Sequence, residues 1–474
     1  MTLSLRKGYA YCMADRGKIL VALSLVLASA GAGRTVSAET WAIQFVDVGS
    51  NSGQSTSLGL VNGYPVISYF GSPRNLKYAA LSPVDKKWIL QTVDAGGEFT
   101  SLAVDSSGIV HVGYLNGFTM QLKYWRNNQG QTTIQVIDSE PGQGGMGFYN
   151  SIQVDASGTP HISYYHTRDP AGGITDDLKY AVLNGSTWST AFIDRFAERG
   201  KYNSLALDAM GNPQIAYFDN VGTLRLAKQV AGIWTTQGID STGDSGRFNS
   251  IRIDALGRPH ISYIAAAPVV LRYAYFDGAL WHYEDVDGVG AVVAPSVTSL
   301  ALDASGNAHI SYYDAASTSL KYASRIGGVW TVQTVDSVGD VGGYSSLRLD
   351  AQARPIISYF DATTAALKIA YGDYPDQDAD GIPDVFDSCP SNPDCNSNGI
   401  VDGREGGVPQ GTKQGVRRLG DESIFGCGSL SALHGASGPP GGGPPPTDLL
   451  LLLAPAFYLM FRKCLGRPAG RRPC

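Results

Sequence analysis

The sequence predicts an all-β fold, a seven-bladed β-propeller, and the prediction begins from one recurring phrase. A Trp, four variable positions, Val or Ile, and Asp occur in that order about every 48 residues, with Thr132 in place of Trp in the third copy. Repeats of this length indicate stacked units that cannot bury their apolar faces alone. The seven copies end at Asp47, Asp94, Asp138, Asp194, Asp240, Asp287 and Asp336.

Three further segments recur between these phrases, and each is typical of a strand. SLAVD at 101–105 and its relatives alternate apolar and polar residues, which indicates a half-buried strand. A D-x-x-G turn follows, and after it comes a HISYY-like segment. The last segment is LKYA, at 76–79 in its first copy, and its relatives. Four strands in each of seven units predict the propeller.

The chain ends give a second observation that supports this count. The chain enters on a lone strand at 41–47 and leaves after 367–370, so the two incomplete copies together make one blade. This resembles the strand exchange by which propellers close, with the N-terminal strand outermost in the last blade. Over 41–371 the tandem units also resemble repeat arrays of secreted bacterial proteins.

Flanking segments predict export. We expect a signal peptide at 1–38, with Arg16 and Lys18 before the apolar run 19–30 and a small-residue cleavage site at 36–38. The propeller then spans 39–374 and a calcium-binding segment spans 375–405. The net charge of −6 shows no basic footprint for nucleic acid. We expect a monomer.

The C-terminal part is read as a Gly/Pro-rich linker at 406–447 and an apolar segment with a basic end at 448–474. This layout, with Cys427 before it, resembles the C-terminal sorting signals of bacterial surface proteins. A simple membrane anchor is the alternative. All six cysteines lie outside the propeller, and Cys389 and Cys395 flank a short turn that would suit a disulfide in an oxidising compartment.

Residues 376–405 carry the motif with the most specific chemistry, two successive loops with the spacing of calcium ligands. Calcium takes six to eight hard oxygens, and alternate side chains around a Gly supply them. Cys389-Pro390 and the run 394–402 resemble the thrombospondin type 3 calcium repeat; an acidic linker is the alternative. The expected ligands are Asp376, Asp378, Asp380, the Ile382 carbonyl, Asp384 and Asp387 in the first loop, and Asp394, Asn396, Asn398, the Ile400 carbonyl, Asp402 and Glu405 in the second.

The segment should be disordered without calcium, because its carboxylates repel one another and little apolar area opposes chain entropy. The propeller should stay folded in both conditions. Other repeated polar and aromatic residues are interpreted as structural. These are the aspartates that end each phrase, the Trp and Tyr residues as blade-to-blade packing, and the four strand histidines His111, His161, His260 and His309.

For function, we expect an exported, surface-displayed protein whose propeller binds a glycan or protein ligand and whose segment 375–405 forms a calcium-binding stalk, with calcium as the cofactor. No G-x-S-x-G, HExxH or phosphate-binding Gly loop is present, although a glycan-active hydrolase with two distant carboxylates is the alternative. A ligand site is expected on the face with the longer loops, because loop variation on a rigid scaffold carries function. The candidate residues there are Tyr165, Asp219, Asp240, Asp314, Asp336 and Asp361.

Overall fold

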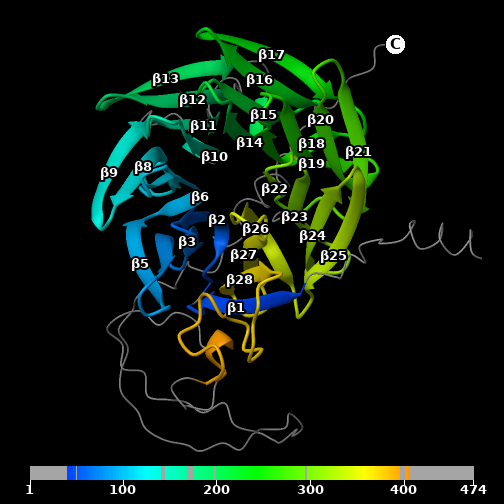
Figure 1. Ribbon diagram of the computed structural model, residues 1–474. Coiled ribbons are helices and arrows are strands. Elements are labelled where there is room, and N and C mark those ends of the chain that lie inside the picture. The colour runs from blue at the N-terminus through cyan, green and yellow to red at the C-terminus, as the bar shows by residue number, and fades with distance from the viewer. Residues whose placement is uncertain are drawn as a thin grey trace, which may run out of the picture. The chain divides into compact units, whose positions relative to one another are not determined.

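The computed structural model of the chain describes residues 40–49, 51–139, 145–167, 176–195, 199–293, 296–394 and 401–404. Within these residues the chain forms 28 strands in seven antiparallel four-stranded sheets, which are the blades of a propeller around a central channel (Figure 1). The predicted fold class and the number of blades are confirmed.

Each blade has the strand order that the repeat predicts. The innermost strands, which contain the SLAVD-like segments, are β2 (Gln54–Val61), β6 (Gly97–Val104), β10 (Gly145–Val154), β14 (Arg199–Leu207), β18 (Ser245–Ile253), β22 (Ser299–Leu302) and β26 (Val341–Leu349). The second strands, which contain the HISYY-like segments, are β3 (Tyr64–Gly71), β7 (Val110–Asn116), β11 (Pro160–Thr167), β15 (Pro213–Asp219), β19 (Pro259–Ala266), β23 (Ala308–Asp314) and β27 (Pro355–Asp361).

The outer half of each blade follows the same order. The third strands are β4 (Asn75–Leu81), β8 (Gln121–Asn128), β12 (Asp177–Asn184), β16 (Leu224–Val230), β20 (Val269–Phe276), β24 (Ser319–Ile326) and β28 (Ala366–Gly372). The outermost strands, which contain the Trp/Asp phrases, are β5 (Trp88–Ala95), β9 (Gln131–Asp138), β13 (Thr187–Asp194), β17 (Ile233–Asp240), β21 (Trp281–Gly288), β25 (Val329–Asp336) and β1 (Trp41–Asp47).

Strand β1 closes the ring as the sequence predicts. It pairs with β28, so that Trp41 lies opposite Gly372, and it completes the blade made by β26, β27 and β28. In Figure 1 the blue β1 lies outside the yellow strands of this blade. We number the blades 1 to 7 from β2, which makes the blade with β1 blade 7.

Serine hydroxyls join neighbouring blades near the channel. In each blade the Ser of the inner strand accepts a hydrogen bond of 2.9–3.2 Å from a backbone N–H of the next blade's inner strand. These bonds form an unbroken ring of seven, because Ser346 of blade 7 accepts from Leu58 N of blade 1. The ring serines are Ser57, Ser101, Ser151, Ser204, Ser250, Ser299 and Ser346.

Large aromatic residues fill the space between blades farther out. Trp188 of blade 3 packs edge-on against Tyr124 of blade 2, with ring centroids 5.1 Å apart, and its Nε1 donates to Gln135. Trp330 makes the same kind of contact with Tyr273 at 5.3 Å. The interpretation of the repeated aromatics as blade-to-blade packing is confirmed.

The strand histidines are also structural. Nδ1 of His111 lies 2.7 Å from the Tyr124 hydroxyl, and its Nε2 lies 3.3 Å from a carboxylate oxygen of Asp105, which starts the D-x-x-G turn. The other three histidines lie between corresponding Tyr and Asp residues, each within its own blade. They therefore do not converge on a shared metal.

Among the described residues, no helix is long and apolar enough to span a membrane. The only helical element there is the short 3₁₀ turn η1 (Asp402–Arg404). The predicted signal peptide, linker and C-terminal segment lie outside the described residues, as does Cys395, the predicted partner of Cys389.

Candidate functional site

Aspartates after the last strand gather around two points. A carboxylate oxygen from each of Asp376, Asp378 and Asp380 lies within 4.8 Å of the other two, and the same holds for Asp380, Asp387 and Asp402. We call these five residues the carboxylate cluster. Asp380 belongs to both groups, so the two points share a ligand.

In four of the five carboxylates a backbone N–H binds one oxygen and the other oxygen is buried. Gly381 N donates to Asp376 Oδ2 at 3.1 Å, and Ile382 N donates to Asp380 Oδ1 at 2.7 Å. Asp378 and Asp387 are bound in the same way by Asp380 N and Cys389 N. One oxygen of each of these four carboxylates, Asp376 Oδ1, Asp378 Oδ2, Asp380 Oδ2 and Asp387 Oδ2, is buried and accepts no hydrogen bond.

Burial and mutual repulsion make this cluster costly without a cation. Desolvation, and then the charges of Asp378, Asp387 and Asp376, raise the pKa of Asp380 to about 7. The pKa values of Asp376 and Asp387 are raised as well, with burial as the largest cause. Buried carboxylates without partners are unfavourable unless a cation neutralises them.

The structure rearranges the predicted ligand sets. Asp376, Asp378 and Asp380 share one group and Asp387 joins Asp380 in the other, whereas Asp384 accepts a hydrogen bond from Gln377 N and is in neither group. Asp402, expected in the second loop, lies with Asp380 and Asp387 of the first. Asp394 is described but is not in the cluster, while Asn396, Asn398, Ile400 and Glu405 lie outside the described residues.

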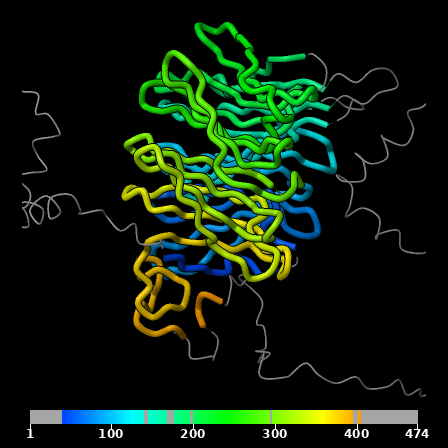
Figure 2. The backbone as a smooth tube through the Cα atoms, turned by 90° about the vertical axis from the view of Figure 1, so that its right-hand side faces the viewer, coloured from blue at the N-terminus to red at the C-terminus, as the bar shows by residue number. Residues whose placement is uncertain are grey.

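Residues 375–394, the first part of the predicted calcium segment, pack against the ring and do not project from it as a separate stalk. Ile382 and Phe386 are buried in one apolar cluster with Ala42 of β1. The Phe386 ring lies 5.2 Å from that of Tyr371 and 5.8 Å from that of Tyr64. Both views show the orange segment beside the blue β1 (Figures 1 and 2).

Close backbone contact fixes this docking. Gly381 has a φ of +94°, and a Cβ on it would lie 2.3 Å from the carbonyl oxygen of Ile43 in β1. Gly403 is equally constrained, since its Cβ would lie 2.1 Å from the Asp380 carbonyl oxygen. The carboxylate cluster is therefore built directly on the strand that closes the propeller.

On the long-loop face, the phrase-ending aspartates form a repeated network between blades. Each accepts a hydrogen bond of 2.5–2.8 Å from the Tyr hydroxyl of the next blade's second strand. A Lys or Arg from the third strand of that blade lies beside each carboxylate, as Lys368 does at 3.0 Å from Asp336. These aspartates therefore join blades, a role that the sequence interpretation of them as turn residues did not include.

The six candidate ligand residues lie within or beside this network. Asp314 and Asp361 are at most 3% exposed and pair with Lys321 and Lys368 at 2.9 and 3.1 Å. Asp219 lies 3.7 Å from Arg225, and the buried Tyr165 hydroxyl donates to Asp176. Asp240 and Asp336 are bound by Tyr263 and Tyr359 at 2.7 Å. Most of these side chains thus already have hydrogen-bond or ion-pair partners within the protein.

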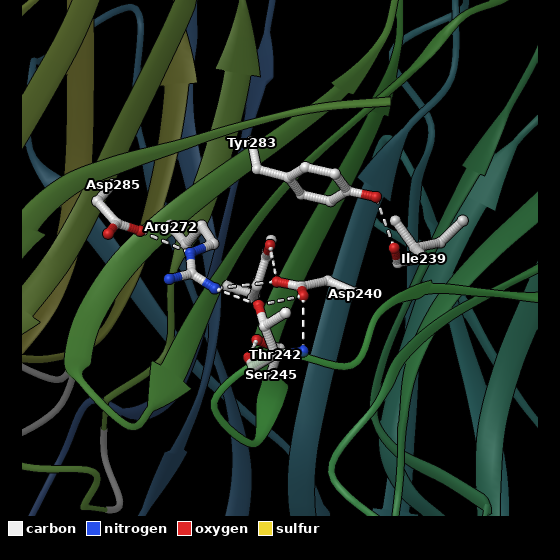
Figure 3. A network of polar contacts seen from close by, with 8 residues as sticks. Ile239, Asp240, Thr242, Ser245, Arg272, Tyr283 and Asp285 are labelled. Atoms are coloured by element: carbon white, nitrogen blue, oxygen red, sulfur yellow. Dashed lines mark hydrogen bonds and ion pairs between the residues drawn. The ribbon is translucent and has the colours of Figure 1, made fainter. Parts of the chain in front are cut away.

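Asp240 lines an open cavity, which lies between blades 4 and 5 and has a volume of about 440 Å³. Arg272 crosses its floor and donates to Asp240 at 3.1 Å and to Asp285 at 2.6 Å (Figure 3). Tyr283 closes one side by donating to the Ile239 carbonyl at 2.6 Å. Burial alone would raise the pKa of Asp240, but bonds from Thr242 and Tyr263 lower it below its ordinary value.

An arc of aromatic residues, which the sequence analysis did not predict, lies at the start of the inner strands. Phe99, Tyr149, Tyr202 and Phe248 lie in successive blades, with neighbouring ring centroids 5.2, 4.8 and 4.4 Å apart. We call these four residues the aromatic arc. Each has a φ near +50°, which is strained for an aromatic residue.

A sequence signal for the arc exists. An aromatic residue stands two positions before the ring Ser in five blades, and the fifth such residue is Tyr344 of blade 7. Burial raises the pKa of Tyr149, and the neighbouring Tyr202 and then Tyr344 raise it further. The residues that follow the arc, Thr100, Asn150, Asn203 and Asn249, line the channel itself.

Comparison with known proteins finds likeness in solved structures alone, because no family model and no curated protein sequence matches the chain. AofleA from Arthrobotrys oligospora is 14% identical, with 64% of this chain and 91% of that chain covered at a TM-score of 0.44. The fucose-specific lectin from Aleuria aurantia is 13% identical, with 62% and 97% covered at 0.43. An ulvan lyase is 14% identical, with 70% and 96% covered at 0.46. These values are too low to assign a ligand.

Proposed function

We propose that this chain is an exported binding protein in which Ca²⁺, held by the carboxylate cluster, fastens the closed propeller. The observation that carries the calcium assignment is the set of four buried carboxylate oxygens that accept no hydrogen bond while backbone amides hold their partners. Export is supported by the N-terminal sequence pattern. Calcium at millimolar concentration is typical outside cells.

The donor set favours Ca²⁺ over other metals. All five clustered side chains are carboxylates, whereas zinc and copper sites in proteins use His and Cys. Ca²⁺ accepts irregular sets of six to eight oxygens, while Mg²⁺ demands a near-octahedral set and keeps several waters. A cluster of shared carboxylates with a bridging Asp380 fits the larger, more adaptable ion.

Calorimetry on the purified protein tests this assignment. We expect saturable Ca²⁺ uptake at about 10⁻⁴–10⁻³ M or tighter, and weaker uptake of Mg²⁺. Asp380→Asn should weaken Ca²⁺ binding at least tenfold, because this residue belongs to both groups. Asp373→Asn is the matched control, since Asp373 is exposed, lies two residues before the segment and is outside the cluster. Equal calcium binding by both variants would refute the assignment.

For the ligand, the aromatic arc favours a glycan. Binding sites are commonly lined by aromatic side chains with a few polar groups, and the C–H faces of sugars pack on aromatic rings. The strained backbone under the arc costs about 1–3 kcal/mol at each position, and such strain clusters at functional sites. The arc also lies on the side of the longer loops, where the sequence places a ligand site.

Glycan arrays with the calcium-loaded protein test the ligand. Tyr202→Ala and Phe248→Ala should reduce binding, with folding checked by thermal unfolding. Phe118→Ala is the control, because Phe118 is 61% exposed on the same face but outside the arc. Binding that survives both arc variants, or that Phe118→Ala abolishes equally, would contradict the arc as the site.

The hydrolase alternative has less support. A glycosidase needs one carboxyl whose pKa is raised so that it can donate a proton. On the long-loop face, burial raises the pKa of Asp240 and Asp314, but hydrogen bonds and the Lys321 charge beside Asp314 lower both values below normal. A glycosidase panel should therefore show no turnover, and turnover without saturable glycan binding would reverse this ranking.

A further inference from the structure

The central channel contains a second polar cavity, with a volume of about 160 Å³. Its walls come from inner strands of all seven blades and are made mostly of Ser, Thr and Asn side chains. Arg252 of blade 5 and Arg348 of blade 7 are the only charged residues among those that line it. The cavity therefore combines many hydrogen-bond donors with positive charge and no negative charge.

These two arginines depart from the repeat. The equivalent position, two residues after each ring Ser, is occupied by Gly59, Ala103, Gln153, Ala206, Arg252, Ala301 and Arg348. Four blades carry Gly or Ala at this position, and blade 3 carries a neutral Gln. Packing of the ring thus does not require a cation at this position, and the two arginines need another explanation.

Neither guanidinium has a carboxylate partner within the described residues. Arg252 Nη1 donates to the carbonyl of Ile251 at 2.7 Å, and Arg348 Nη1 donates to the carbonyl of Leu347 at 3.0 Å. Arg258 and Arg354, near the same ends of these blades, each lie 2.7 Å from a carboxylate. The remaining N–H groups of Arg252 and Arg348 are left for another acceptor.

The pKa values of both arginines are consistent with the lack of a neighbouring negative charge. Burial, and then the charge of Arg348, lower the pKa of Arg252 to about 9, and burial lowers that of Arg348 to about 10. Both side chains stay protonated at neutral pH. Two like charges in one confined cavity repel each other, and an anion between them would relieve that cost.

We propose that the central channel binds a tetrahedral oxyanion, sulfate or phosphate, through Arg252 and Arg348. Guanidinium groups recognise such ions with paired N–H donors, and the surrounding hydroxyls and amides complete the hydrogen bonds. This site is separate from the carboxylate cluster and does not depend on the proposed calcium or glycan binding.

The cavity size favours a free ion over a larger acidic molecule. A water molecule occupies about 30 Å³ in the liquid, so 160 Å³ accommodates an oxyanion with a few waters. A sulfated or uronic-acid sugar would fit only through its acidic group. A free ion and a sulfated sugar present the same tetrahedral oxyanion, whereas a uronic acid presents a planar carboxylate, and binding measurements distinguish these sources.

The test is calorimetry of the calcium-loaded full chain with sodium sulfate and with sodium phosphate, each at constant ionic strength balanced by NaCl. The phosphate titration is run below the point at which calcium phosphate precipitates. We expect saturable binding of at least one ion and a matching rise in thermal stability. Arg252→Gln and Arg348→Gln should each weaken binding about tenfold or more, and the double variant should abolish it.

These variants are chosen because blade 3 carries Gln153 at the same position, so the ring tolerates Gln there. Without added oxyanion, both should be at least as stable as the parent protein, since each removes an unpaired charge. Arg258→Gln is the control and should leave oxyanion binding unchanged, because Arg258 is paired with Asp254.

Two results would overturn the proposal. One is the absence of saturable sulfate and phosphate binding by the parent protein, or equal binding by the Gln variants. The other is Arg-dependent binding of a sulfated saccharide or glucuronate with none of the inorganic ions, which would assign the arginines to a larger ligand.

Discussion

Asp47 shows how much one carboxylate does in this ring. It ends β1 and accepts hydrogen bonds from Gly49 N, Tyr69 Oη and Lys77 Nζ, each at 2.8 Å. Tyr69 and Lys77 belong to blade 1, so Asp47 connects the closing strand of the last blade to the first. Six other aspartates repeat this arrangement between the remaining blades.

Replacing Asp47 should therefore weaken ring closure. Asp47→Asn leaves Lys77 without its carboxylate, and we expect a loss of about 2–3 kcal/mol in the free energy of unfolding, measured by denaturant titration. Asp85→Asn, at an exposed turn of blade 1, should have no measurable effect. Equal stability of Asp47→Asn and the parent would show that the network is not stabilising.

The strand histidines predict a pH dependence. Desolvation lowers the pKa of His111 below its ordinary value, against the opposing charge of Asp105, and the nearby Arg126 lowers it further. The other three histidines shift in the same direction, also through burial. Folded protein keeps them neutral, whereas unfolded chain takes up protons below about pH 6.5. Stability should thus fall between pH 7 and pH 5.5.

Thermal and denaturant unfolding at several pH values tests this dependence. We expect up to about 1 kcal/mol of loss for each histidine over that range. Replacing the four histidines with Gln, which blade 4 carries as Gln214 at the same position, should flatten the profile. An unaltered slope in the fourfold variant would refute the role of burial.

At the scale of elements, the calcium segment and β1 form one assembly. Gly381 lies against Ile43, and its positive φ and lack of Cβ are both required there. Gly381→Ala should undock the segment, weaken calcium binding about tenfold and speed amide exchange in β1.

Gly278 supplies a matched control for that variant. Its φ is +108°, yet nothing lies within 4 Å of the position of its Cβ. Gly278→Ala therefore adds the same backbone strain without the clash, and its calcium binding should equal that of the parent. If the two variants behave alike in calorimetry, contact with β1 does not support the site.

The repeat predicted the strands and their order well because each blade reuses one local pattern. Ring closure also followed from the sequence, since the two incomplete copies are visibly complementary. Contacts between blades were harder to predict. That Asp402 meets Asp380, or that Arg252 and Arg348 share a cavity, depends on distances across the folded ring, which a strand period does not encode.

The docking of the calcium segment was missed for a related reason. Ile382 and Phe386 are isolated apolar residues in an acidic run, and neither shows a periodic pattern. Their partners, Tyr64 and Tyr371, come from opposite ends of the repeat region. Local composition led to the expectation that the segment has no core. In the structure its apolar residues instead pack into an apolar cluster of the propeller.

At the scale of the whole molecule, calcium removal should loosen one blade and leave the others intact. Hydrogen exchange with and without chelator should show lost protection in 375–394 and in β1 (Trp41–Asp47), because the segment covers this strand. Protection of β9 (Gln131–Asp138), an outermost strand far from the cluster, should not change. Uniform loss in both strands, or none in β1, would contradict the coupling.

Closure by β1 also has a consequence for the order in which the protein assembles. Residues 41–47 are among the first to be synthesised, yet their partner strand β28 is made last. The first strand must wait unpaired until the rest of the propeller has been synthesised, and contacts of such long range form slowly. The cluster next to it is completed later still, by Asp402. Folding should therefore begin in the middle blades, and the pairing of β1 with β28 should be its last step.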